Sequence, residues 1–256
     1  MNVQVLILSK FSFVIFRVVC RFYVLLTLIR IPQLSLLEMF TNFLFQSNYS
    51  QPLMEKHKMS IEQLIHRDRN HASVVMWSIA NEPRTKHFNA DQYFELIAKY
   101  TKELDPTRPI TAAIAQPMQE DKAVSSMTLD KSLVLLSFCF FHSKAQHLDI
   151  ISFNRYNGWY QNPGKLNMIR SYVYKEAKGW HELHNKPVLM SEYGSDTAEG
   201  LHMLPAFVWS EEYQAQQFSK HFEAFDQLRN EGFFIGEFVW NFADFKTAQS
   251  ELFPIH

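Results

Sequence analysis

The chain has 256 residues, enough for one domain with a sizeable core or for one (β/α)8 barrel of about 250 residues. Its formal net charge is −1, from 25 basic and 26 acidic side chains, which argues against a nucleic-acid partner or a strongly charged target surface. The two cysteines, Cys20 and Cys139, supply neither a disulfide framework nor a metal-binding spacing.

Residues 1–35 are apolar and basic, and no acidic residue precedes Glu38. The longest uncharged apolar stretch in this segment, Phe22–Ile29, is too short for a membrane span of about 20 residues. The segment also lacks the pattern of a signal peptide. We interpret it as a truncated or misannotated start, and the alternatives are a strand–turn–strand segment or sequence that is not naturally coding.

From residue 36 onward, helical and extended patterns alternate as in an α/β fold. Apolar residues from Leu53 to Ile65 recur at helical spacing and predict a first helix. Asn89 is predicted to cap the next helix, with Gln92 completing a capping box. Five short apolar runs predict strands, and they centre on Val74, Ile110, Ile150, Val188 and Phe234. Strands and helices in this order indicate an α/β fold, and five strands are three fewer than a (β/α)8 barrel requires.

Two later helices are predicted between these strands. The apolar face of the first is predicted to contain Leu166, Ile169, Tyr172, Val173 and Trp180. Ser210 is predicted to cap the second helix, because a serine side chain can accept a hydrogen bond from the free N–H groups of the first turn. Its buried side is predicted to comprise Phe218, Phe222, Phe225 and Leu228.

Two of the predicted strands end in a carboxylic acid. The stretch Ala72–Pro83 ends in Asn81-Glu82-Pro83, and the stretch Pro187–Gly194 contains Glu192 near its end. The C-terminal ends of barrel strands form the functional face, so we expect both acids to face one cleft. Two carboxyl groups about 5–5.5 Å apart are what retaining glycoside hydrolysis requires, one as the acid and the other as the nucleophile.

Several stretches of the sequence resemble the catalytic barrel of the β-glucuronidases in glycoside hydrolase family 2. They are RDRNHASVVMWSIANEP (67–83), NRYNGWY (154–160), SEYG (191–194), TAEGLH (197–202), WSEEYQ (209–214) and GEFVWNFADF (236–245). The similarity extends from about Glu62 to Ser250. The NEP and SEYG pair is shared with other members of the family, including β-galactosidases, whereas NRYNGWY and WNFADF favour glucuronidases.

The resemblance implies roles for the two acids and for the substrate. Glu82 would be the acid/base, Glu192 the nucleophile, and Asn81 a ligand of the sugar 2-hydroxyl. The substrate would be a terminal β-D-glucuronoside, from a glycosaminoglycan or a glucuronide conjugate. We expect hydrolysis to need no metal and no organic cofactor.

Three aromatic residues complete the implied site. Tyr156 and Tyr160 would lie in the sugar-binding cleft, with Tyr156 bonded to the nucleophile, and Trp240 would form a platform under the sugar ring. The resemblance also implies a lysosomal or secretory location, to which the sequon Asn48-Tyr49-Ser50 would be relevant, and a homo-oligomer. We expect no membrane span.

The family pattern is interrupted at 124–145, which we interpret as an insertion, with a retained intron as one explanation. It also stops before the Asn-Lys segment with which the family binds the substrate carboxylate. The resemblance therefore implies an atypical apolar segment at 1–35 that is not homologous to the family, followed at 36–256 by an incomplete (β/α)8 TIM barrel carrying roughly the last five strands of the catalytic barrel. Three alternatives stay open: a β-galactosidase- or mannosidase-like hydrolase of the same family, a catalytically inactive fragment, and a membrane-anchored interaction protein built on residues 1–35.

Overall fold

The structure, a computed structural model, describes residues 3–5, 15–18, 49–85, 90–116, 118 and 147–240. The chain divides into two compact units. Unit 1 comprises Met1–Tyr23, Phe153–Glu182 and Pro187–His256, and unit 2 comprises Val24–Ser152 and Leu183–Lys186. The predicted insertion at 124–145 and the predicted boundary at residue 35 lie outside the described residues, so both stay predictions.

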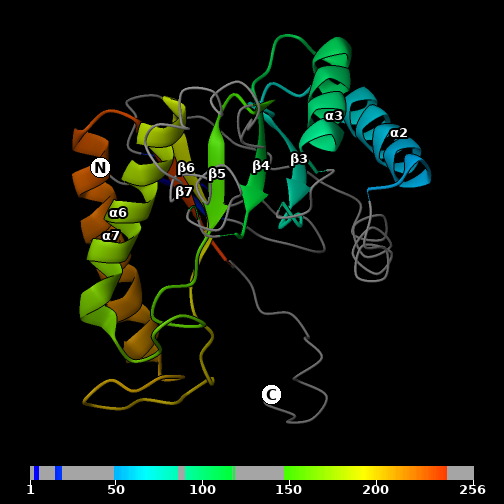
Figure 1. The fold of residues 1–256 in the computed structure, drawn as a ribbon. Helices are drawn as coiled ribbons and strands as arrows, with labels where there is room; N and C mark the ends of the chain where they lie inside the picture. The colour runs from blue at the N-terminus through cyan, green and yellow to red at the C-terminus, as the bar shows by residue number, and fades with distance from the viewer. Residues whose placement is uncertain are drawn as a thin grey trace. The chain divides into compact units, whose positions relative to one another are not determined.

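Unit 2 is built on a strand–helix–strand connection. Its regular elements are α2 (Gln51–Asp68), β3 (Trp77–Asn81), α3 (Ala90–Leu104) and β4 (Ile110–Ile114). Strands β3 and β4 are parallel, with Trp77 opposite Ile110. Helix α3 contacts both strands, and α2 lies alongside α3 (Figure 1). This is the arrangement that the alternation of helical and extended patterns predicts.

The helices of unit 2 bury the faces that their spacing predicts. Helix α2 buries Leu53, Met54, His57, Ile61, Leu64 and Ile65. Helix α3 buries Ala90, Tyr93, Phe94, Ile97, Ala98 and Thr101. The predicted cap of α3, Asn89, lies outside the described residues.

The prediction for the first strand is wrong at the N-terminal end, because the strand starts later than predicted. The apolar run centres on Val74, but β3 begins at Trp77, whose N–H donates to the carbonyl of Pro109 at 3.0 Å. The N–H of Val74 donates to the carbonyl of His71 at 3.1 Å. Its own carbonyl accepts from Nε of Arg108 at 2.7 Å. A distant arginine therefore holds these residues in a turn, which apolar periodicity alone does not predict.

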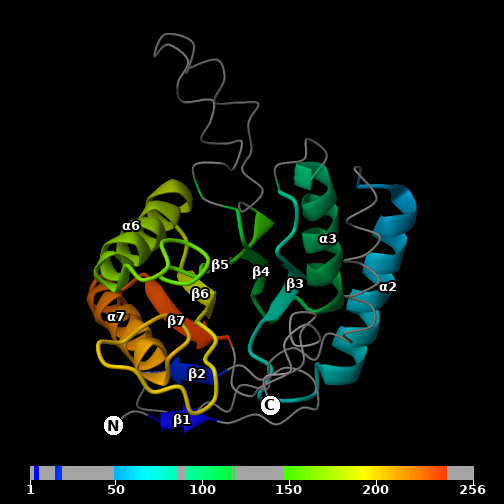
Figure 2. The ribbon, with the colours of Figure 1, turned by 90° about the horizontal axis from the view of Figure 1, so that it is seen from below.

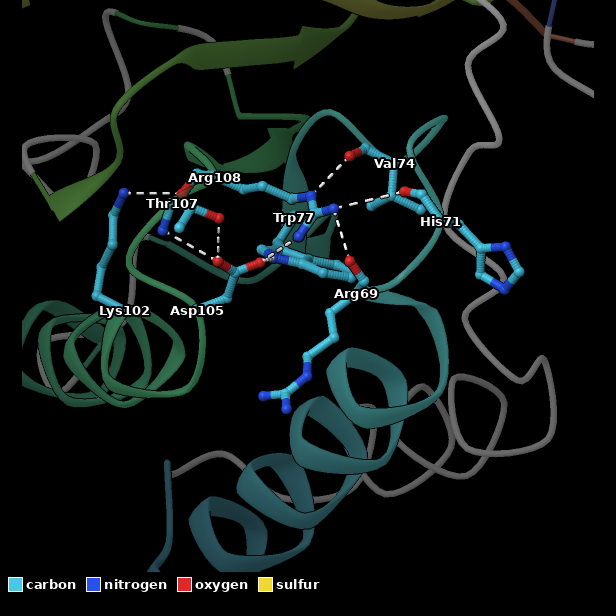
Figure 3. Close-up of polar contacts among 8 residues, drawn as sticks. All are labelled: Arg69, His71, Val74, Trp77, Lys102, Asp105, Thr107 and Arg108. Atoms are coloured by element: carbon cyan, nitrogen blue, oxygen red, sulfur yellow. Dashed lines mark hydrogen bonds and ion pairs between the residues drawn. The ribbon is translucent and has the colours of Figure 1, made fainter.

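The carboxylate of Asp105 joins this turn to the start of β3 (Figure 3). One oxygen accepts from Nε1 of Trp77 at 3.0 Å and from Nη1 of Arg108 at 2.7 Å, and the other accepts from the N–H and hydroxyl of Thr107. Burial by itself would raise the pKa of Asp105, but the hydrogen bonds from Thr107, Arg108 and Trp77 outweigh it and hold the pKa well below its usual range. The N-terminal ends of β3 and β4 thus carry a polar cluster with a structural role.

Unit 1 contains the second half of the predicted barrel strands. Its regular elements are β1 (Val3–Val5), β2 (Ile15–Val18), the end of β5 (Ile151–Asn154), most of α6 (Leu166–His184), β6 (Val188–Tyr193), α7 (Glu211–Asn230) and β7 (Phe234–Val239). The hydrogen-bonded order is β1-β2-β7-β6-β5 in unit 1 and β5-β4-β3 in unit 2, with the residues of β5 divided between the units. Strands β6 and β7 are parallel, and α6 and α7 lie side by side (Figure 2).

Strands β1 and β2 come from the segment 1–35. They pair with each other in antiparallel fashion, and β2 pairs antiparallel with β7. Residues 6–14 between them lie outside the described residues, so the interpretations of this segment stay predictions. The five strands from β3 to β7 match the five predicted apolar runs in order, apart from the start of β3, and the predicted α/β class is confirmed.

Helix α7 begins as predicted, and its buried face agrees only in part with the predicted one. The hydroxyl of Ser210 accepts from the N–H of Tyr213 at 3.2 Å. The four predicted core residues divide evenly into buried Phe225 and Leu228 and half-buried Phe218 and Phe222. Two polar residues, Gln217 and His221, are fully buried on this helix. The prediction for α6 is also wrong at Tyr172, which is exposed.

In the part of the chain that the structure describes, no helix combines the length and apolar character needed to cross a membrane.

Candidate active site

Glu192 is the second-to-last residue of β6, in unit 1. The first three residues of the strand, Val188–Met190, are buried and fix it in the sheet. Ser191 and Glu192 are half-buried. The hydroxyl of Ser191 donates to the side-chain carbonyl oxygen of Asn154, the last residue of β5, at 2.7 Å. The end of β6 therefore presents a carboxyl group from a position that is fixed by the buried strand and by a hydrogen bond to the end of β5.

The residues that follow β5 hold Glu192 at two points. The hydroxyl of Tyr156 donates to Oε2 of Glu192 at 2.5 Å. The N–H of Arg155 donates to the backbone carbonyl of Glu192 at 2.9 Å. A hydrogen bond at this distance restricts the rotation of the carboxyl group. The bond between Tyr156 and the predicted nucleophile, expected from the family resemblance, is present.

An ion pair of Arg155 supports this arrangement, and sequence reasoning missed the role of this residue. Its guanidinium forms a close ion pair with Glu176 of α6, with N–O distances from 2.5 to 3.2 Å. Both side chains are largely buried, at 7% and 15% exposure. A two-point arginine–carboxylate contact fixes orientation as well as distance. It therefore anchors the backbone immediately before Tyr156, and nothing local in the sequence identifies Glu176 as the partner.

Aromatic rings continue outward from Tyr156. The ring of Tyr160 lies edge-on to that of Tyr156, with centroids 5.1 Å apart, and Tyr160 is 73% exposed. Trp159 contacts Tyr160 at 6.2 Å between centroids and Trp209 at 4.7 Å. A row of aromatic rings therefore begins at Tyr156, and aromatic side chains of this kind are suited to contact with a sugar ring.

Trp240 follows β7 and lies beside the end of β6. Its N–H donates to the carbonyl of Tyr193 at 2.8 Å, and its side chain is half-buried. Gly194 permits this contact: it has φ +154°, and a Cβ there would lie 2.2 Å from the carbonyl oxygen of Trp240. Only glycine allows the two backbones to approach so closely. The rest of the WNFADF motif, 241–245, lies outside the described residues.

Asn81 and Glu82 lie at the C-terminal end of β3 in unit 2. The register with β4 shifts between Ser78 and Asn81, which brings Asn81 opposite Ala113. The N–H of Glu82 donates to the carbonyl of Ala113 at 2.7 Å, and Glu82 has φ +47°. Such a conformation costs a non-glycine residue roughly 1–2 kcal/mol. Backbone strain of this kind is concentrated at functional sites.

A buried histidine supports β3 two residues before Asn81. His57 of α2 donates from Nε2 to the carbonyl of Ile79 at 2.7 Å and accepts at Nδ1 from the hydroxyl of Tyr93 at 2.9 Å. A carbonyl can only accept, so Nε2 carries the proton. Burial lowers the pKa of His57 to about 4, although the hydrogen bond to the Ile79 carbonyl opposes the shift. The sequence shows His57 only as a member of the buried face.

The structure brings together four of the six predicted site residues. Glu192, Tyr156, Tyr160 and Trp240 share unit 1 and are linked through the contacts above. Asn81 and Glu82 belong to unit 2, and their pairing with Glu192 across one cleft stays a prediction. Over the described ranges, no group of three or more His, Cys, Asp or Glu side chains is arranged to hold a metal ion.

A parallel α/β sheet with carboxylic acids at the ends of two strands is typical of a TIM-barrel enzyme. Residues 31–254 match the family model described as "Glycosyl hydrolases family 2, TIM barrel domain". The chain therefore belongs to glycosyl hydrolase family 2, a family of glycosidases, and it carries that family's barrel domain.

The individual relatives include several β-glucuronidases, as the motifs predict. The β-glucuronidase of Sus scrofa is 34% identical over 203 residues, which are 79% of this chain and 28% of that protein. The structure of the Dictyoglomus thermophilum β-D-glucuronidase is similar with a TM-score of 0.66 and 35% identity, over 79% of this chain and 31% of that one. A Ruminococcus gnavus β-glucuronidase in complex with D-glucuronic acid gives 0.62 and 33%, over 77% and 30%. The chain thus spans less than a third of the length of these relatives.

Proposed function

We propose that this barrel domain carries the catalytic carboxyl groups of an enzyme that hydrolyses terminal β-D-glucuronosides with retention of configuration. The observation that carries the proposal is the 2.5 Å hydrogen bond from Tyr156 to Glu192 at the C-terminal end of β6. The similarity to proteins named β-glucuronidase, one of them in complex with D-glucuronic acid, supports the choice of sugar.

In the proposed reaction, Glu192 attacks the anomeric carbon while Glu82 donates its proton to the glycosidic oxygen. The bond to the leaving group breaks and an ester between the sugar and Glu192 forms. Glu82, now a carboxylate, takes a proton from water as the water attacks the anomeric carbon. The ester breaks, and both acids return to their starting protonation states. A strand-held carboxylate fixed by a phenol suits the attacking role.

The neighbouring residues would bind and orient the sugar. Asn81 precedes Glu82 on the same strand and would hydrogen-bond the 2-hydroxyl, a contact that strengthens in the transition state. Trp240 would stack beneath the C–H face of the ring, and Tyr160 would border the leaving group. None of these steps requires a metal or an organic cofactor.

The proposal extends to location and substrate source. We infer that the enzyme works in the lysosome or the secretory pathway, as its resemblance to the β-glucuronidases implies. There it would act on glycosaminoglycan ends or on glucuronide conjugates.

The test is hydrolysis of nitrophenyl β-D-glucuronide by the purified chain and by matched variants. Glu192→Gln should abolish turnover, and Glu223→Gln, on the surface of α7, should leave it unchanged. Preference for the β-D-galactoside or β-D-mannoside would favour the other family activities. No turnover of any of these by the wild-type chain would favour the inactive-fragment alternative.

A second measurement separates the roles of the two acids. Azide needs no general base, so it should restore turnover of Glu82→Gln and form the β-glucuronosyl azide. It should not restore Glu192→Gln with the same anomer. For the wild-type chain, NMR of the sugar as it is first released should show the β-anomer. Release of the α-anomer would contradict a retaining mechanism.

A further inference from the structure

A stripe of polar residues runs along the buried face of α7. Tyr213, Gln217 and His221 are spaced one helical turn apart and have 2%, 0% and 0% exposure. Burying an amide or an imidazole costs free energy unless hydrogen bonds compensate for lost contact with water. Such side chains are therefore expected to make specific contacts that an apolar residue could not.

The amide of Gln217 uses both of its donor hydrogens. Nε2 donates to the carbonyl of Asn157 at 3.1 Å and to the carbonyl of Gly194 at 2.9 Å. Both partners are carbonyl oxygens, so only the amide nitrogen can face them. Among the described residues, Oε1 of Gln217 has no hydrogen-bond partner. Leaving this buried oxygen unsatisfied costs free energy. The two donated bonds therefore account for the presence of a glutamine at this position.

These two carbonyls belong to the segments that carry the proposed nucleophile and its phenol. Asn157 directly follows Tyr156, and Gly194 lies two residues after Glu192. The hydroxyl of Tyr156 donates to the carboxylate of Glu192 at 2.5 Å. We propose that Gln217 is a positioning residue that ties the Tyr156 loop to the end of β6 and so aligns Tyr156 with Glu192. The inference rests on the function proposed for Glu192.

The other two members of the stripe each attach one of these segments. The hydroxyl of Tyr213 donates to the carbonyl of Gly158 at 2.5 Å and accepts from the N–H of Gly164 at 2.8 Å, so it holds the loop. The ring of His221 stacks on Tyr193 with centroids 4.8 Å apart, so it supports the strand end. Of the three, Gln217 is the member that bonds to both segments.

The first test replaces Gln217 with methionine, which has a similar length but no donor. A misplacement of about 1 Å at a reacting group can cost roughly 100-fold in rate, so Gln217→Met should lower kcat by about 10- to 100-fold. KM for nitrophenyl glucuronide should change by less than about twofold, because the glutamine does not touch the sugar. Gln216→Met, at an exposed position on the same helix, is the control and should behave as wild type.

A double-mutant cycle distinguishes positioning from general stabilisation. If Gln217 acts through the Tyr156–Glu192 contact, Gln217→Met should cost about twofold or less once Tyr156→Phe has removed that contact. If Gln217 only stabilises the fold, the two losses in kcat should multiply, and that result would overturn the proposal.

A third measurement does not depend on turnover. The N–H of Arg155 donates to the Glu192 carbonyl, so its hydrogen exchange reports on the link between the loop and β6. Gln217→Met should accelerate this exchange at least about tenfold while amides in the middle of α7 keep their protection. Unchanged exchange at Arg155 would exclude the bridging role. Failure of the wild-type chain to hydrolyse glucuronides, with accelerated exchange in the variant, would count against the proposed function alone.

Discussion

The C-terminal ends of β3 and β6 each present a carboxylic acid, yet they hold it in different ways. At β3 the unusual backbone conformation is at the acid itself, because Glu82 has φ +47° after a shift of register with β4. At β6 the acid lies within the strand, and the unusual backbone comes two residues later, at Gly194.

This difference indicates which contacts hold the backbone or side chain at each strand end. At Glu82 the backbone is held by its left-handed conformation and by the bond from its N–H to the carbonyl of Ala113. At the end of β6, Tyr156 donates to the Glu192 carboxylate, and Gln217 of α7 donates to the carbonyl of Gly194. Variants of Tyr156 or Gln217 should therefore disturb the position of Glu192.

The largest effect is expected from Gly194→Ala. The added Cβ would lie 2.2 Å from the Trp240 carbonyl oxygen, so the ends of β6 and β7 must separate. We expect a loss of about 3–4 kcal/mol in the free energy of unfolding, measured with denaturant. Gly164→Ala is the control: its φ is also positive, at +80°, but no atom lies within 4 Å of the added Cβ, and it should cost about 1–2 kcal/mol. Equal losses would contradict the close approach at Gly194.

The next largest effect is expected from Tyr156→Phe. A hydrogen bond to a charged group contributes about 1.5–3 kcal/mol, so kcat for a glucuronide should fall by roughly 10- to 100-fold. Stability should change little, since the phenol bonds to a half-buried carboxylate. A variant that keeps full activity would show that Glu192 does not depend on its neighbours as the comparison requires.

Two buried histidines, one in contact with β3 and one in contact with β6, should make the free energy of unfolding depend on pH. Burial lowers the pKa of both His57, under β3, and His221, on α7, to about 4. The unfolded chain therefore binds protons that the folded chain does not, and stability should fall as pH drops from about 6.5 to 4, by up to about 1.4 kcal/mol per pH unit per histidine. His57→Gln and His221→Gln should each flatten this slope, measured by urea unfolding across the range. An unchanged slope would mean that the replaced histidine is protonated in the fold.

The smallest effect is expected at the opposite end of β3. Hydrogen bonds hold the pKa of Asp105 below its value in the unfolded chain, so its contribution is present above about pH 4 and is lost on acidification. Between pH 5 and pH 3, Asp105→Asn should therefore lose less stability than wild type, by about 1 kcal/mol. A steeper acid loss in the variant would contradict the bonding shown in Figure 3.

The C-terminal ends of β3 and β6 were predictable because the sequence signal for each is local. An apolar run followed by an acid and a turn residue indicates a strand that delivers a carboxyl group, as at Glu82 and Glu192. The start of β3 was not predictable, because the side chain of Arg108 determines it from a distance of over thirty residues in sequence. Apolar periodicity predicts a buried position but not a buried polar residue there, so Gln217 was missed.

The supporting contacts of the site were also outside the reach of sequence reasoning. The ion pair between Arg155 and Glu176 depends on how α6 packs beside β5, and no spacing rule relates the two residues. The left-handed conformation of Glu82 follows a shift of register between β3 and β4, and a single sequence shows neither feature. Motif resemblance predicted the two acids as site residues, whereas the structure shows the contacts made at each strand end.

The most direct test of the account is covalent labelling of the purified chain with 2-deoxy-2-fluoro-β-D-glucuronosyl fluoride, followed by peptide mass spectrometry. The fluorine at C2 slows breakdown of the sugar ester and the fluoride leaves without an acid, so the intermediate accumulates. We predict a single adduct on Glu192 in the wild-type chain and in Glu82→Gln, and none in Glu192→Gln. An adduct on any other residue, or labelling that persists in Glu192→Gln, would contradict the assignment of Glu192 as the nucleophile.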